Sequence, residues 1–309
     1  MTSYLIAGAG GYIGSRLAAR LLAAGHRVRG LVYSAEDPVV ERLAARGMAV
    51  WIGDLTRPET IDGVTDEIEV VYNLTNRMPI DGSALLRSLY VDGNQHLIAM
   101  SVRSRTVRAY VWASSVAPYG DHGESWVDED SPIAPSYPLG TILATAEQAI
   151  LQAVRAYRFP AIILRMATIY GPDRDPVEAI ASGQLTIYGN GRNFVPHIHI
   201  DDAVEALIRV AEIGQIGSIY NVCDDEPMRL IEIVGEVRRR LGMLPPRVFD
   251  PQVGLRAGLD RSVIGMLTAS VRLSNARMRH DLGLELHYPS LRYWIDERLP
   301  IELAVGVGR

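Results

Sequence analysis

A glycine-rich segment near the N-terminus has the residue types and spacing that bind a phosphate-bearing ligand. It reads Gly8-Ala9-Gly10-Gly11-Tyr12-Ile13-Gly14 and lies between an apolar run and a helical pattern. Gly8 allows a sharp turn, Gly11 lets the backbone approach a pyrophosphate at the helix N-terminus, and Gly14 lets helix and strand pack closely. This context predicts a dinucleotide-binding turn.

The residues that would contact the rest of a dinucleotide follow the next strands. After the second expected strand the chain reads Leu31-Val32-Tyr33-Ser34, without the acid that binds a ribose 2′-hydroxyl or the arginine that binds a 2′-phosphate. Tyr33 is placed to stack on adenine and Arg16 to meet a 2′-phosphate, so NADP is slightly favoured over NAD. Asp54 either accepts a hydrogen bond from the adenine amine or caps a helix. The predicted cofactor-binding residues are Gly8, Gly11, Tyr12, Ile13, Gly14, Arg16, Tyr33, Ser34, Asp54, Leu55, Leu74 and Thr75.

The basic residues of the chain exclude several kinds of chemistry. All 31 are arginine, and the sequence contains no lysine. A Schiff-base lysine, a phosphate-loop lysine and a lysine in a proton relay are therefore excluded. The single cysteine, Cys223, excludes a disulfide framework and a cysteine-clustered zinc site, and we expect no metal.

The elements that must position these residues alternate between short apolar runs and helical patterns. We expect strands at residues 4–7, 28–32, 49–52, 70–74, 110–113 and 161–166, with helices after the glycine turn and at 39–46, 85–102 and 143–156. Such alternation predicts an α/β fold with a Rossmann-like, doubly wound parallel sheet.

The second half of the chain is less regular and predicts a smaller C-terminal substrate lobe. Strands are expected at 185–188 and 219–222, and helices from about 201 and at 230–241, 274–282 and 289–299. We assign residues 1–172 to a dinucleotide-binding domain and 173–309 mainly to the substrate lobe, with 197–222 returning to the first domain.

Composition and charge narrow the class of protein further. A net charge of −5 argues against a nucleic-acid partner, which usually meets a basic surface. No apolar run reaches the length of a membrane span, and the N-terminal residues lack the basic region of a signal peptide. We expect a cytoplasmic protein acting on a small molecule.

Several segments together resemble the extended short-chain dehydrogenase/reductase family, which contains epimerases, dehydratases and ketoreductases, over nearly the whole chain. The glycine spacing is that of the extended branch. The other matching segments are Val111-Trp112-Ala113-Ser114-Ser115, Tyr119-Gly120, Leu164-Arg165, Ile169-Tyr170-Gly171-Pro172, Ile198-His199-Ile200-Asp201-Asp202 and Tyr220-Asn221-Val222.

The resemblance implies catalysis by a serine, a tyrosine and a lysine four residues after the tyrosine. Ser115 matches the serine, but two alignments of the pair are open. One places Tyr137 and Thr141 at the tyrosine and lysine positions; the other, which we prefer because it matches more residues without a gap, places Leu139 and Leu143 there. Neither supplies the lysine that lowers the pKa of the tyrosine. Ser115 and Tyr137 remain the catalytic candidates, and Tyr137 is expected to keep a pKa of ~10.

The same resemblance directs the choice of substrate residues. Nucleotide-sugar members often place a diphosphate-binding arginine where this chain has Val195-Pro196, and Arg192 is the nearest substitute. The predicted substrate-binding residues are Tyr119, Arg165, Tyr170, Arg192 and His197.

The function expected from these features is an atypical NAD(P)-dependent epimerase, dehydratase or ketoreductase acting on a nucleotide sugar or a related polyol or ketone. The alternatives are a non-redox enzyme on the same scaffold and a non-catalytic nucleotide sensor. Family members commonly pair two helices across a dimer, so the helices at 85–102 and 143–156 predict a homodimer. Their apolar residues are Leu85, Leu89, Ile98, Leu143, Ile150 and Val154.

Overall fold

The central element of the protein is a parallel sheet. The computed structural model describes residues 1–76 and 83–300. Its seven-stranded sheet has the order β12-β7-β5-β4-β1-β2-β3, and every neighbouring pair is parallel. The strands are β1 (Ser3–Ala7), β2 (Arg27–Val32), β3 (Ala49–Ile52), β4 (Val70–Asn73), β5 (Ala109–Ser115), β7 (Ala161–Met166) and β12 (Ile219–Val222). The predicted Rossmann-like class is confirmed.

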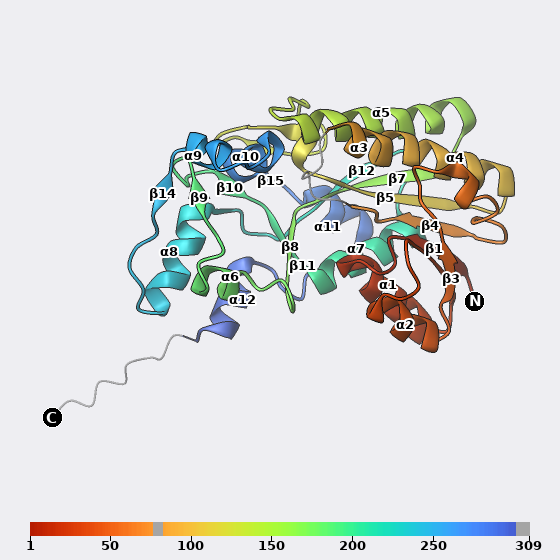
Figure 1. The fold of residues 1–309 in the computed structure, drawn as a ribbon, viewed down its shortest axis with the longest axis horizontal. Helices are drawn as coiled ribbons and strands as arrows, with labels where there is room; N and C mark the ends of the chain where they lie inside the picture. The colour runs from red at the N-terminus through yellow and green to blue at the C-terminus, as the bar shows by residue number, and fades with distance from the viewer. Residues whose placement is uncertain (77–82, 301–309) are drawn as a thin grey trace.

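Helices cover both faces of this sheet and form two cores with it (Figure 1). One face packs on α1 (Tyr12–Ala23), α2 (Pro38–Ala45), α7 (Ile200–Ile213) and α11 (Ala276–Leu282). The other face packs on α3 (Ser83–Arg87), α4 (Gly93–Ser104) and α5 (Pro138–Tyr157). Because β1, β4 and β5 are buried on both sides, their sequences are nearly continuous apolar runs.

The segment at 85–102 is helical as expected, but it is not one regular helix. The segment is divided into α3, a π-helical turn at Ser88–Asp92 and α4. Asn94 donates from its side-chain amide to the carbonyl of Tyr90 at 2.7 Å. That carbonyl would accept from the Asn94 backbone N–H in a regular helix, so the side chain competes with the backbone and widens the turn.

A third core lies under the second half of the chain, where Tyr170, Met228 and Trp294 are buried together. Short strands pair there and at its border: β8 (Thr168–Tyr170) with β11 (His197–His199), β9 (Ile187–Tyr188) with β14 (Val248–Phe249), β10 (Phe194–Val195) with β13 (Met228–Arg229), and β6 (Trp126–Val127) with β15 (Arg272–Leu273). The helices are α6 (Pro176–Ala181), α8 (Leu230–Arg240), α9 (Pro251–Arg256), α10 (Arg261–Thr268) and α12 (Leu291–Arg298), and two 3₁₀ turns lie at Pro58–Thr60 and Ala117–Tyr119.

The division into a first domain and a substrate lobe stays a prediction. Within the span assigned to the lobe, β12 forms one edge of the central sheet and α7 packs on the same face as α1. The last nine residues of the expected lobe, 301–309, lie outside the described residues. The strand expected at 185–188 is shorter than predicted, since only Ile187–Tyr188 pair.

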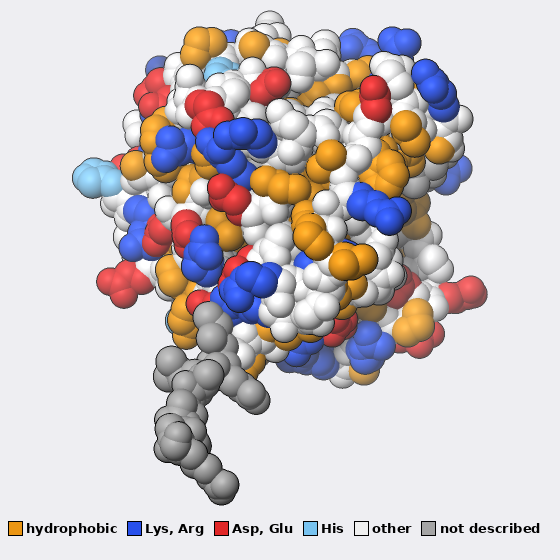
Figure 2. All heavy atoms as spheres, turned by 90° about the vertical axis from the view of Figure 1, so that its left-hand side faces the viewer, with side chains coloured by type: hydrophobic (Ala, Val, Ile, Leu, Met, Phe, Trp, Pro, Cys, Tyr) orange, Lys and Arg blue, Asp and Glu red, His pale blue; other side chains and the backbone are white. Residues whose placement is uncertain are grey.

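Charges of both signs are interspersed on the outer face of the second half, with apolar side chains between them (Figure 2). Ion pairs in this part of the molecule include Arg239–Glu236 at 2.8 Å and Arg298–Asp175 at 2.7 Å. Across residues 1–76 and 83–300, no helix combines the length and apolarity needed to cross a membrane.

Candidate dinucleotide site

Three of the four glycines in the turn between β1 and α1 have the predicted spacing, and each lies in a different environment. Gly8 has φ +85°, a conformation that side chains disfavour, and a Cβ on it would lie 3.0 Å from the Leu74 carbonyl oxygen. A Cβ on Gly14 would lie 2.2 Å from the Gly8 carbonyl oxygen, so α1 could not pack as it does. A Cβ on Gly11 would meet only that same oxygen, at 3.2 Å. Apart from this one close contact, no described atom beyond the chain neighbours lies within 4 Å of that Cβ position, which leaves room for a ligand at the helix N-terminus.

A cleft of about 560 Å³ lies over this turn, along the carboxyl ends of the first strands. It brings together ten of the predicted cofactor-binding residues. They are Gly8, Gly11, Tyr12, Ile13, Gly14, Tyr33, Ser34, Leu55, Leu74 and Thr75. The described lining residues that were not predicted are Gly10, Leu31, Val32, Asp37, Val40, Gly53, Asn76, Leu89 and Arg174.

Two predicted cofactor-binding residues are not among the described residues that line the cleft. Asp54 accepts hydrogen bonds from the Thr56 backbone N–H at 2.8 Å and the Thr56 hydroxyl at 2.7 Å, so its carboxylate holds a local turn. Arg16 donates to the Pro172 carbonyl oxygen and forms a 2.9 Å ion pair with Asp173. Both side chains thus have partners outside the lining of the cleft.

Asp37 is an acid at the cleft that the sequence analysis missed. It is the N-cap of α2, where its Oδ1 accepts from the Val39 backbone N–H at 2.8 Å. Asp37-Pro38 is the usual start signal of a helix, and Asp37 lines the cleft together with Tyr33 and Ser34. The prediction for this side of the cleft covered only Leu31-Val32-Tyr33-Ser34, and Asp37 lies three residues further along the chain.

In the preferred alignment, the positions of the family's tyrosine and lysine carry no charged group. Leu139 and Leu143 are buried on α5 in the core that it forms with the sheet. Tyr137 is the N-cap residue of α5, and its ring lies so close to α10 that a Cβ on Gly265 would be 2.4 Å from it. Burial raises the pKa of Tyr137 to about 12, so the expectation of an ordinary phenol pKa was wrong.

The predicted catalytic serine lies at the carboxyl end of β5. Ser115 is half-buried, and its hydroxyl oxygen accepts from the Ala117 backbone N–H at 3.0 Å. Neither Ser115 nor Tyr137 is among the described residues lining the cleft. Their catalytic roles stay predictions.

Two predicted substrate residues are bound in a buried polar network. Arg165 forms a 2.6 Å ion pair with Glu147 of α5, which also accepts from Ser114 at 2.8 Å. The Arg165 guanidinium carbon lies 4.4 Å from the Tyr119 ring centroid. Burial raises the pKa of Tyr119 to about 12, and its hydroxyl donates to Asn221 at 2.7 Å.

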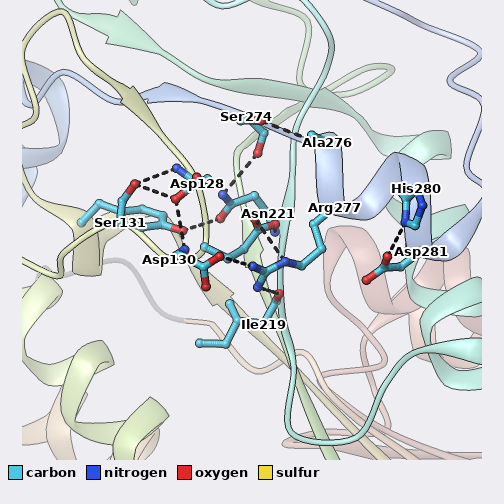
Figure 3. A network of polar contacts seen from close by, with 12 residues as sticks. Asp128, Asp130, Ser131, Ile219, Asn221, Ser274, Ala276, Arg277, His280 and Asp281 are labelled. Carbon is cyan, nitrogen blue, oxygen red and sulfur yellow. Dashed lines mark hydrogen bonds and ion pairs between the residues drawn. The ribbon is translucent and has the colours of Figure 1, made fainter.

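Asn221 extends this network toward the second half of the chain (Figure 3). Its side-chain amide donates to the Ser274 carbonyl at 3.2 Å, while Arg277 of α11 pairs with Asp130 at 2.7 Å. The network links α5, β7 and β12 inside the protein, and the Nη1 atom of Arg165 is buried there without a hydrogen-bond partner among the described residues.

The other predicted substrate residues are also separate from the cleft. Tyr170 and His197 are buried with Trp294 and His199 in an aromatic cluster. Burial lowers the pKa of His197 to about 4, so its ring is neutral at neutral pH. Arg192 is exposed. No predicted substrate residue is among the described residues lining the cleft, and their roles stay predictions.

A second, more open cleft of about 570 Å³ lies between α1, the start of α7 and α12. Arg20, Asp201, His287, Tyr288, Tyr293 and Glu297 line it. None of these described lining residues is a glycine, so the backbone cradle of the first cleft has no counterpart among them. In residues 1–76 and 83–300 no cluster of three or more His, Cys, Asp or Glu side chains could hold a metal ion.

The fold and the glycine cleft together define a dinucleotide-binding α/β protein, and comparison with known proteins specifies its class. Residues 4–223 match the model of the NAD dependent epimerase/dehydratase family, so the chain belongs to that family. Its homologues are dehydratases, reductases and epimerases.

Three relatives illustrate the range of the family. A 3-diazoavenalumate denitrifying reductase from a Streptomyces species is 29% identical over 306 residues, covering 93% of this chain and 97% of that protein. The dTDP-glucose 4,6-dehydratase of Bacillus anthracis, solved with NAD, superposes with a TM-score of 0.78 at 20% identity over 96% of this chain and 97% of that chain. The corresponding enzyme of Streptomyces venezuelae, solved with NAD and TYD, gives a TM-score of 0.79 at 21% identity over the same shares. The similarity to these two solved structures, at 20% and 21% identity, shows a shared fold alone.

Proposed function

We propose that the protein binds a nicotinamide dinucleotide in the glycine cleft and reduces a small-molecule acceptor without a tyrosine–lysine relay. The cleft fits such a ligand because Gly11 leaves the N-terminus of α1 open and Gly14 brings that helix close to β1. Backbone N–H groups at a helix N-terminus bind pyrophosphate oxygens. When bound, the dinucleotide supplies hydride chemistry.

The side chains around the cleft have distinct tasks in this proposal. Leu31, Val40 and Leu55 supply apolar surface for the adenine, and Tyr33, which is 65% exposed, supplies an aromatic face at the rim. Leu74 and Thr75 follow β4 toward the nicotinamide side.

The carboxylate of Asp37 favours NAD over NADP, which reverses the slight preference drawn from the sequence. It belongs to the same cleft lining as Tyr33 and Ser34, where a ribose hydroxyl can donate to it and a 2′-phosphate would be repelled. The structures of two dehydratases with NAD agree with this choice at the level of fold. The cofactor identity is nevertheless our proposal.

The observation that carries the proposed reaction is the burial of Leu139 and Leu143 on α5. Oxidation of a sugar hydroxyl requires a base to take its proton, and the neutral, buried Tyr137 does not supply one at neutral pH. An acceptor whose reduction creates no alkoxide needs no such base. An electron-poor aromatic diazo compound is an acceptor of this kind, since it loses dinitrogen as the ring gains hydrogen.

The 29% identity to a denitrifying reductase, along almost the whole of both chains, supports the same acceptor class. We therefore place a diazo acceptor ahead of the nucleotide sugar, polyol or ketone first expected. The non-redox enzyme and the non-catalytic sensor remain alternatives that the following experiment separates.

The experiment measures oxidation of NADH at 340 nm with 3-diazoavenalumate, after subtraction of the enzyme-free rate. A parallel reaction contains NAD and dTDP-glucose and is analysed for a 4-keto product. We expect turnover with the diazo compound and none with the sugar. Turnover of the sugar alone would establish the dehydratase alternative, and binding without turnover of either would favour the sensor.

A further inference from the structure

A tight turn after β8 fixes the position of an arginine at the mouth of the cleft. In the segment Gly171-Pro172-Asp173-Arg174, the Arg174 backbone N–H donates to the Gly171 carbonyl at 3.0 Å. Pro172 is well suited to the second position of such a turn, and Asp173 adopts φ +68° at the third. Asp175 then caps α6, with its side chain accepting from the Val177 backbone N–H at 2.8 Å. The backbone on both sides of Arg174 is thus held in place.

The turn is also attached to the first turn of α1. The Tyr12 hydroxyl donates to the Pro172 carbonyl oxygen at 2.6 Å, and Arg16 pairs with Asp173 at 2.9 Å. Gly171 is packed so closely that a Cβ on it would lie 2.7 Å from the Ile200 side chain. Tyr12 and Arg16, which follow Gly11, therefore connect α1 directly to the 171–174 turn.

The guanidinium groups of Arg16 and Arg174 both lie against the Tyr12 ring but differ in charge balance. Their guanidinium carbons lie 4.0 Å and 4.3 Å from the ring centroid, respectively. Arg16 is neutralised by Asp173, whereas Arg174 has no carboxylate partner among the described residues. Arg174 is also the only basic side chain among the described residues that line the cleft. Arg174 is thus an exposed cation without a counter-charge among the described residues, and it lies over Tyr12, the first residue of α1.

We propose that Arg174 is the cation that binds the pyrophosphate of the dinucleotide, an inference that rests on the proposed function. A guanidinium offers paired donors that match phosphate oxygens, and the Arg174 guanidinium carbon is held 4.3 Å from the Tyr12 ring centroid. The chain has no lysine for this task. The cation comes from beyond β8, so dinucleotide binding engages both the glycine turn and the second half of the chain.

The test compares Arg174→Gln with the wild type by calorimetric titration of NAD and of ADP-ribose, which keeps the pyrophosphate but lacks nicotinamide. Arg155→Gln is the matched control, because Arg155 is an exposed arginine of α5 outside the cleft lining. We expect Arg174→Gln to weaken both ligands about tenfold and equally, as loss of a charge-assisted contact should. Arg155→Gln should change neither, and thermal unfolding should show that both variants are folded.

Two results would overturn the inference while leaving the proposed function standing. One is unchanged affinity of Arg174→Gln for both ligands. The other is a loss confined to NAD, which would place the contact at the nicotinamide. Failure of the wild type to bind NAD, NADP or ADP-ribose would instead refute the proposed function itself.

A second variant tests the attachment of the turn. Tyr12→Phe keeps the ring beneath Arg174 but removes the hydrogen bond to Pro172. We expect about threefold weaker binding of both ligands, smaller than the loss in Arg174→Gln because the cation remains. A loss larger than that of Arg174→Gln would show that the turn, and not the charge, determines affinity.

Discussion

At the scale of single residues, Tyr137 is the most informative side chain. Its phenol would have to ionise to act as a base, and burial with no cation beside it raises its pKa to about 12. The phenol is therefore protonated throughout the neutral range, and its ionisation begins only in strong alkali.

Tyr137→Phe should consequently leave turnover within about twofold of the wild type, with no inflection between pH 6 and 9 that depends on this residue. The measurement is kcat across that range with the diazo acceptor, with Ser115→Ala assayed alongside. A loss of about a hundredfold or more, together with a neutral pH optimum in the wild type, would show that the phenol is activated.

Asp37 determines cofactor preference in our account. Asp37→Asn keeps the side-chain oxygen that caps α2 but removes the negative charge facing the ribose. We expect the ratio of NADP to NAD dissociation constants to fall about tenfold, mainly through tighter NADP binding. An unchanged ratio in calorimetric titrations would place the 2′-position elsewhere.

The residues of the glycine turn could be predicted from the sequence, and Asp37 could have been found from its helix-start signal, whereas Arg174 could not. Three glycines at fixed spacing between a strand and a helix have one dominant structural explanation. Arg174 lies about 160 residues after the glycine turn in the sequence. It reaches the cleft through a turn whose direction depends on tertiary packing.

At the scale of elements, two glycines of the turn between β1 and α1 have different tasks. Gly11 leaves room for the ligand, and Gly14 lets the helix pack. Gly11→Val should fold, because a Cβ there meets only one atom at 3.2 Å, but it should abolish NAD binding by filling the open space. Gly14→Val should instead destabilise the protein, since its Cβ would lie 2.2 Å from a carbonyl oxygen. Calorimetry and thermal unfolding distinguish the two. Unaltered NAD affinity in folded Gly11→Val would contradict our placement of the pyrophosphate.

The buried ion pair between α5 and β7 should matter to stability. Glu147→Gln leaves the buried Arg165 without its counter-charge, and such a change costs about 3–5 kcal/mol of unfolding free energy. The control is Glu226→Gln, whose partner Arg292 is exposed, with an expected change below about 1 kcal/mol. Urea denaturation measures both, and equal effects would mean that burial of the pair contributes nothing.

The elements of the central sheet were predictable because buried parallel strands leave long apolar runs, as at Ala161–Met166. The two-residue strands of the second half, such as Phe194–Val195, are too short to show any periodicity. The π-helical turn at Ser88–Asp92 arises from one side chain, Asn94, whose competing hydrogen bond no hydropathy pattern records.

At the scale of the whole molecule, the homodimer stays a prediction, and fewer of the expected apolar side chains are available to form its interface. Leu89, Ile98, Leu143 and Ile150 are buried within the protein's own core, whereas Leu85 is 37% exposed. The predicted dimer should appear at twice the monomer mass of 34.0 kDa in light scattering at micromolar concentration, and Leu85→Arg should shift it toward monomer. A wild-type monomer would rule it out.

We propose that this family member reduces its acceptor without the tyrosine–lysine relay, and transfer of deuterium from NADH deuterated at C4 is the decisive test of that proposal. The product formed from 3-diazoavenalumate by the wild type and by Tyr137→Phe is analysed by mass spectrometry. We expect one deuterium on the product ring, at equal extent in both proteins and absent without enzyme. Absence of enzyme-dependent deuterium in the wild-type product, or its loss in Tyr137→Phe alone, would contradict the account.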